Sequence, residues 1–336
     1  MTAPGSQLLT NIQVAAETGA LGTAVARTRK FYGISTGTFD PGYQWQSHAA
    51  ENRGSKIRSP RSTLIQQEPK ITLSDIDGIA YDDLVLPLSM GLQGGLTGVG
   101  GAADKVWSFA PVTTAVSNAY ESACMDFGDD IQNYTVAGLI CTGWTLSAEV
   151  GGPTKFSADL IGMTTVKGAA TALSNITPEY MSGELWTIAH AANWAGLAAA
   201  SAAGTFLKSF SLKYVPGVLP VHYLDGSLAF GQIVEGEISG TLDLEFDSTA
   251  LAVSAYYDKN VAQTPVWIKL SNVGAALGGT NYGLVIYLYG YVTDVKPISG
   301  ESDGINHYTA TVALDYDSVG AHHLTATLTC SLAAIP

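Results

Sequence analysis

The sequence predicts a mainly β protein with two tandem antiparallel β-sandwich or barrel-like units, each with a short flanking α-helix, behind a long irregular N-terminal arm. Three observations predict this class. Residues 238–246 and 324–332 alternate between apolar and polar side chains, a period that gives a strand one buried and one wet face. The 37 glycines, with many serines and threonines, favour strands and turns. The order of patterns in the first half also returns in the second half.

The repeat is an order of strand, helix, strand, strand and strand. In the first half it begins at residues 68–75 and continues through a short apolar helical stretch at 81–92. In the second half it begins at 237–244, with the helical stretch at 248–259. The other matched segments are 105–109 with 265–269, 138–150 with 284–297, and 156–162 with 308–314. Ring-forming structural proteins are often built from repeated units, whereas a single active site gains nothing from being doubled.

Three segments follow from these patterns. Residues 1–62 form an N-terminal arm and extended loop without regular alternation, and such long irregular segments are usually functional or ordered by a partner. Residues 63–172 form the first β unit and residues 173–336 the second. The boundary lies within 164–184, where the alternation is lost and Pro178 and Gly183 interrupt the chain.

Charge is distributed unevenly along the chain. The net charge of −13 divides into +4 for residues 1–70 and −17 for residues 71–336. A basic arm on an acidic body indicates contact between copies, although a solvated basic loop is the alternative. The residues expected to make this inter-subunit contact are Arg27, Arg29, Lys30, Arg53, Lys56, Arg58 and Arg61. The acidic body argues against tight binding of nucleic acid, which needs Lys and Arg against the phosphates.

The sequence predicts no enzyme, cofactor or metal site. Residues 33–37 match G-x-S-x-G, but Pro41 and Gly42 make a turn where a nucleophile elbow needs a helix. The glycine-rich segment 95–101 lacks the spacing of a phosphate-binding loop. Neighbouring histidines at 322 and 323 point to opposite faces of a strand and do not chelate one metal well. No stretch of 18 apolar residues predicts membrane insertion.

Several segments together carry a resemblance to a known family. They are residues 17–27 with Phe31-Tyr-Gly33, residues 72–95 ending Leu88-Ser-Met-Gly-Leu-Gln-Gly-Gly95, residues 105–111, residues 138–162, and the hairpin-like 291–317. In these segments, which span most of the chain in order, the sequence resembles the major tail tube proteins of long-tailed (siphovirus-like) bacteriophages.

The resemblance implies a structural protein of the virion tail, made in the host cytoplasm. Subunits of that family close into rings, commonly six-fold, whose inner sheets join into one barrel, and stacked rings form the conduit for the genome. If both halves of this chain carry the tube fold, three chains make a pseudo-hexameric ring; if one half does, six chains are needed. The implied partners are other copies of the chain and the tape-measure, tail-tip and terminator proteins, in a tail that we expect to be non-contractile.

In such a tube, DNA passes through the lumen without specific binding, since phosphates do not adhere to carboxylates. Asp243 and Glu245 share a strand face with Thr241, and we expect the two carboxylates to face the lumen.

Two alternatives stay open at this point. One is another β-rich viral assembly protein, such as a capsid decoration or a surface-layer-like subunit. The other is a carbohydrate-binding or hydrolytic β-sandwich, which needs an exposed aromatic platform or paired carboxylates in a cleft. The tryptophans considered for such a platform are Trp45, Trp144, Trp186, Trp194 and Trp267. They are scattered along the chain, and three lie in strand patterns that favour core packing.

Overall fold

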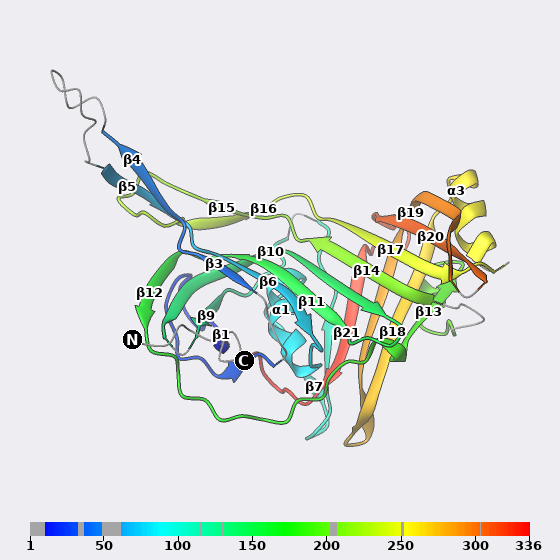
Figure 1. The fold of residues 1–336 in the computed structure, drawn as a ribbon, viewed down its shortest axis with the longest axis horizontal. Helices are drawn as coiled ribbons and strands as arrows, with labels where there is room; N and C mark the ends of the chain where they lie inside the picture. The colour runs from blue at the N-terminus through cyan, green and yellow to red at the C-terminus, as the bar shows by residue number, and fades with distance from the viewer. Residues whose placement is uncertain are drawn as a thin grey trace.

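A computed structural model describes residues 11–32, 37–48, 62–114, 116–129, 131–201, 207–249, 252–302 and 304–336. The protein is mainly β, as predicted, and its strands form layered antiparallel sheets that are consistent with a β-sandwich (Figure 1). None of the helices in these described ranges is long and apolar enough to cross a membrane.

In the described part of the first half, the structure has twelve strands. They are β1 (Asn11–Ala16), β2 (Arg29–Lys30), β3 (Thr38–Asp40), β4 (Tyr43–Ser47), β5 (Ser62–Gln67), β6 (Lys70–Asp77), β7 (Val99–Gly100), β8 (Lys105–Phe109), β9 (Ala123–Gly128), β10 (Asn133–Glu149), β11 (Lys155–Ile161) and β12 (Thr164–Gly168). The helix α1 (Val85–Gly91) continues a 3₁₀ turn, η3 (Asp82–Leu84).

Among the residues described in the second half, nine strands are present. They are β13 (Trp186–Ala191), β14 (Leu207–Val215), β15 (Val218–Val221), β16 (Gln232–Glu235), β17 (Ser239–Asp247), β18 (Val266–Leu277), β19 (Thr280–Ser302), β20 (Ile305–Leu314) and β21 (Leu324–Cys330). The helix α3 (Asp258–Ala262) continues a π-helical turn, η6 (Val253–Tyr257), and two 3₁₀ turns lie at η4 (Gly183–Leu185) and η5 (Trp194–Leu197).

The two halves repeat one pattern of strand pairing. In the first half β3 pairs with β6, β6 with β11, and β11 with the C-terminal part of β10. The N-terminal part of β10 lies between β9 and β12, and β9 pairs with β1. In the second half β14, β17, β20, β19, β18, β21 and β13 pair in the same way. The hairpin β4–β5 likewise has a counterpart in β15–β16.

The repeat extends to an irregularity. The register between β10 and β11 shifts between Cys141 and Gly143, and the register between β19 and β20 shifts between Val292 and Asp294. Each shift leaves one extra threonine in the long strand, Thr142 or Thr293. Such a bulge bends a strand and increases its twist, which suits two strands that each belong to two sheets.

One predicted match between the halves is wrong, and the description of the N-terminal arm needs a correction. Residues 105–109, matched by sequence to 265–269, form β8, which pairs with β21. The counterpart of β18 by pairing is β9, because each makes a hairpin with the long strand that follows it. The arm is also less irregular than expected, since β1 to β4 all lie within residues 1–62.

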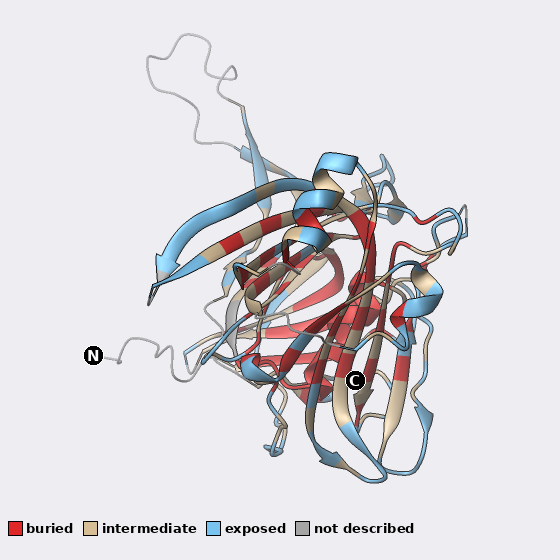
Figure 2. Ribbon diagram, turned by 90° about the vertical axis from the view of Figure 1, so that its right-hand side faces the viewer, coloured by how far each residue is buried: buried red, intermediate tan, exposed pale blue. Residues whose placement is uncertain are grey.

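A further pairing joins the halves. The C-terminal part of β10 pairs with β14 as well as β11, so one large sheet runs in the order β3-β6-β11-β10-β14-β17-β20-β19. Trp144 of β10 stacks on Tyr214 of β14 at 5.3 Å between ring centroids. The pairings among the described strands branch but form no closed ring. Buried residues from both halves line a shared core, while the hairpin ends are exposed (Figure 2). We therefore treat residues 63–172 and 173–336 as two proposed repeats packed on one core.

Ion pairs made by two arginines, Arg27 and Arg29, fix the segment after β1 to the first repeat. Arg29 Nε lies 2.6 Å from Asp83 Oδ1, and Arg29 Nη2 lies 3.6 Å from Asp82 Oδ2. The backbone N–H of Tyr32 donates to the other oxygen of Asp83. Burial raises the pKa of Asp83, and the Arg29 guanidinium opposes that rise. Arg27 Nε lies 2.9 Å from Asp126 Oδ2, which is fully buried. Removing one partner of such a pair leaves the other charge buried, without a counter-ion and without water.

We predict that Arg29→Met lowers the free energy of unfolding by about 3–5 kcal/mol, because Asp83 is left buried without its cation. Urea unfolding measures the change. Lys30→Met is the matched control, since the hydrogen bond of Lys30 to Asn175 among the described residues is exposed. The double variant Arg29→Met/Asp83→Leu recovers most of the loss; a double variant as unstable as Arg29→Met contradicts this explanation.

His190 makes stability depend on pH. Its Nε2 lies 2.7 Å from the hydroxyl of Tyr256, and burial lowers the pKa of His190 to about 4. The unfolded chain takes up this proton near pH 6.5. Stability from the neutral imidazole is therefore present above pH 6.5 and is lost as the pH falls towards 4. We predict that wild type loses on the order of 1–3 kcal/mol more than His190→Gln over this range. If the free energy of unfolding falls equally with pH in the two proteins, the assignment of this pH dependence to His190 is wrong.

Candidate assembly interface

The large sheet has one face on the core and one polar face. Cross-strand rows carry small hydroxyl side chains on the polar face: Thr145, Ser147, Ser157, Ser209, Ser211, Thr241, Thr309 and Thr311. The opposite rows carry buried side chains such as Leu146, Leu212 and Leu244. The alternation of the sequence therefore produces a broad wet surface across both repeats.

Asp243 and Glu245, predicted to face a lumen, lie on this polar face. The hydroxyl of Thr311 donates to Asp243 Oδ1 at 2.6 Å. Glu245 lies 2.8 Å from His307 Nδ1 and accepts from the hydroxyl of Ser209. Both carboxylates are held by neighbouring strands of the sheet, with Asp243 exposed and Glu245 half-buried.

The predicted basic arm is divided by the structure. Arg27 and Arg29 are nearly buried and form ion pairs within their own chain, so in the single chain these two guanidinium groups are not free for a neighbour. The inter-subunit role expected for them stays a prediction that these ion pairs do not support, because net charge along the sequence does not show which cations have buried partners. Lys30 bonds to Asn175. The remaining cations, Arg53, Lys56, Arg58 and Arg61, lie outside the described residues.

Two hairpins extend from the large sheet. In Figure 1, β4–β5 projects from the body at the upper left and β15–β16 lies beside its base. The backbone N–H of Gln67 donates to Leu228 O, and Gln66 Nε2 lies 2.9 Å from His222 Nε2, so the hairpins are linked. Trp45, 59% exposed, lies on β4. An exposed apolar side chain on a projecting element is typical of a contact with another subunit.

The large sheet ends in two edges. β3 pairs with β6 alone among the described strands, and the part of β19 after Val292 pairs with β20 alone. Unpaired N–H and C=O groups on such edges are templates for pairing with another chain. Sequence reasoning missed these edges, because three residues, Thr38 to Asp40, carry too little alternation to reveal a strand.

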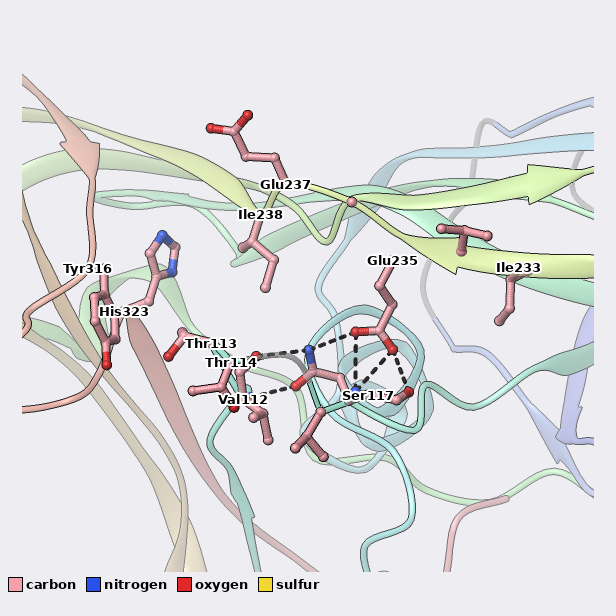
Figure 3. Close-up of a pocket in the computed structure, with 14 residues that line it drawn as sticks. Val112, Thr113, Thr114, Ser117, Ile233, Glu235, Glu237, Ile238, Tyr316 and His323 are labelled. Atoms are coloured by element: carbon pink, nitrogen blue, oxygen red, sulfur yellow. Dashed lines mark hydrogen bonds between the residues drawn. The ribbon is translucent and has the colours of Figure 1, made fainter.

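A surface pocket of about 700 Å³ lies between the loop at 112–118 and the segment at 233–238 (Figure 3). Its carboxylate Glu235 accepts from the hydroxyl of Ser117 at 2.5 Å and from the backbone N–H of Asn118 at 3.0 Å. Burial lowers the pKa of His323, which keeps the imidazole neutral near pH 7. Glu237 also lines the pocket, so the pocket holds two carboxylates, and Glu235 is the one that ties the two segments together.

The other motifs have structural roles where they are described. His322 stacks on Trp194, and His323 packs edge-on to Tyr214. Trp144 and Trp186 are buried, as expected for core residues. Ser35 of the G-x-S-x-G segment lies outside the described residues. Within the described part of the chain, no group of three His, Cys, Asp or Glu side chains is placed to hold a metal ion.

Comparison with known proteins gives the family. No curated protein sequence matches the chain. A family model described as phage tail tube protein matches residues 13–317, nearly the whole chain and both repeats. The chain therefore belongs to the phage tail tube protein family.

Proposed function

We propose that the chain polymerises into stacked rings that form the tail tube, a conduit for delivery of the genome into the host cell. One observation carries the proposal: a single sheet with a polar face runs through both repeats and ends in unpaired edges. Closing such a sheet through neighbouring copies removes its lateral edges. A head-to-tail contact that closes gives a ring. In this proposal the role of the protein is structural.

The repeat supports three chains per ring. Each chain contributes the same pairing pattern twice. Rings of the family are commonly six-fold by the resemblance stated above, so three copies of this chain supply six repeats in a pseudo-hexamer. The linked hairpins β4–β5 and β15–β16, with the cations at 53–61, are the elements we assign to contacts with the next ring.

The polar face of the large sheet lines the lumen in this proposal. Hydroxyl side chains and carboxylates, among them Asp243 and Glu245, give DNA phosphates a wet surface on which lysines such as Lys155 and Lys213 stand beside hydroxyl side chains. The tube ends are completed by the tape-measure, tail-tip and terminator proteins, and the tail is non-contractile and extracellular once the virion has left the host cytoplasm in which the chain is made.

We predict that the purified chain forms hollow tubes or rings at high concentration, with a lumen wide enough for a duplex of about 20 Å. Negative-stain electron microscopy over a concentration series tests it. Sheets or closed shells contradict the tube. Monomers at every concentration, even with tail-tip complexes added as initiators, contradict it as well.

We also predict that Asp243→Lys/Glu245→Lys slows genome release severalfold without preventing tube assembly, because lysines bind passing phosphates. Release of DNA from purified virions measures the rate. Asp258→Lys, at an exposed position on α3 outside the polar face of the large sheet, is the control for reversing the charge of a carboxylate elsewhere. An unchanged release rate in the lysine variant contradicts the assignment of Asp243 and Glu245 to the lumen.

A further inference from the structure

Within the large sheet of the described residues, the two repeats meet at one ladder, and this ladder is a model for the junction between copies. β10 of the first repeat pairs with β14 of the second through six residue pairs, from Trp144 with Tyr214 to Glu149 with Ser209. By the repeated pairing, β19 is the counterpart of β10, and β3 is the counterpart of β14. These counterparts are the two unpaired edges of the large sheet.

The register of the long strands aligns their residues one by one. Thr145 of β10 faces Ser157 of β11, in the third pair after the bulge at Thr142. Lys296 of β19 faces Thr309 of β20, in the same place relative to its own bulge. Lys296 is therefore the counterpart of Thr145, and the residue that follows it, Pro297, is the counterpart of Leu146.

The opposite edge aligns in the same way. In β6, Ile71 faces Phe39 of β3, and the counterpart of Ile71 in β17 faces Leu212 of β14. Phe39 therefore corresponds to Leu212, and Asp40 corresponds to Lys213. Phe39 points to the core like its counterpart, with its ring 4.9 Å from that of Tyr134.

Resting on the proposed function, we infer that the C-terminal part of β19 in one copy pairs antiparallel with β3 of the next copy, with Lys296 opposite Asp40 and Pro297 opposite Phe39. Within the chain, Thr145 faces Lys213 at this position. Where the junction within the chain has a threonine opposite a lysine, the junction between copies has a lysine opposite an aspartate. Opposite charges on facing strands stabilise the pairing.

The side chains at the β19 edge are exposed in the single chain, as expected of a surface that another copy covers. Ile298 is 72% exposed in the single chain, and Lys296 has only its neighbour Asp294 as an ion partner, at 3.9 Å, among the described residues. Pro297 has no N–H, so the ladder is at most one donor short at that residue. Proline on an edge strand also hinders undirected pairing before assembly, which favours joining by complementary charge over aggregation.

The inferred pair is suited to a disulfide test. Val150 N donates to Lys208 O across the β10–β14 junction, so Thr145 and Lys213, five residues away, form a non-hydrogen-bonded pair. Such pairs bring Cα atoms to about 4.5 Å, within the range that a disulfide spans. The same geometry applies to Lys296 and Asp40 of neighbouring copies.

The experiment assembles Asp40→Cys/Lys296→Cys tubes under reduction, oxidises them, and separates the denatured chains without reductant. We expect covalent dimers and trimers in a ladder that stops at three chains, because a three-chain ring closes there. Cys124, Cys141 and Cys330 are buried, so each single variant gives the background. Thr145→Cys/Lys213→Cys is the matched control, which forms the disulfide within one chain. Asp40→Cys/Asp294→Cys shifts the register by two residues and gives little cross-linking.

The outcomes separate this inference from the proposed function. Oxidised tubes of Asp40→Cys/Lys296→Cys that contain only single chains overturn the edge pairing and leave the tube standing. A ladder beyond three chains overturns the three-chain ring. Wild-type protein that forms neither rings nor tubes overturns the proposed function itself.

Charge exchange tests the same contact without cysteines. We expect Lys296→Asp and Asp40→Lys each to raise the protein concentration needed for assembly by about two- to five-fold, the range of an exposed ion pair. The combined variant restores assembly towards wild type. A combined variant that assembles no better than either single variant overturns the pairing of these two residues.

Discussion

The structure depends on the pairing of β10 with β14. This ladder is the direct hydrogen-bonded link between the large sheets of the two repeats, and it places the inner rows of both on a common core. Trp144 and Tyr214, both buried, stack across it. Burial of aromatic pairs of this size stabilises a junction beyond the area they bury. Without this ladder, the edges of β10 and β14 and the buried residues that the two repeats share are exposed to water.

The long strands β10 and β19 carry that arrangement to the other layers. Each begins in one sheet, passes a bulge at a threonine, and ends in the large sheet. The bend directs the chain around the core while the ladder stays continuous. A duplicated bulge at matching positions is stronger evidence of a repeat than the thin sequence identity, because a bulge is a defined feature of the backbone.

Much of the fold could be predicted from the sequence, since alternation reports directly on burial. Residues 238–246 and 324–332 form strands with the expected faces, and the match of 156–162 to 308–314 holds in the pairing of β11 and β20. The partner of β8 could not be predicted, because Lys105 to Phe109 and Pro265 to Lys269 share a pattern that does not encode which strand lies beside it. Alternation is a local property, whereas pairing is long-range.

The charges show the same limit. Arg27 and Arg29 contribute to a basic arm in the sequence, yet their partners Asp126 and Asp83 lie far along the chain and are brought together by folding. The alternation of β17 predicts its polar face and the acidic residues on it. The unpaired edges of the large sheet follow only from the strand pairings of the two repeats.

A cryo-electron microscopy map of the assembled tube is the most direct measurement of the central claim that one sheet runs through every repeat of a ring. The account predicts three chains per ring and strand density that continues from β19 of one copy into β3 of the next, spaced like β10 and β14. A ring of six chains, or a gap at those edges filled by another element, would contradict it.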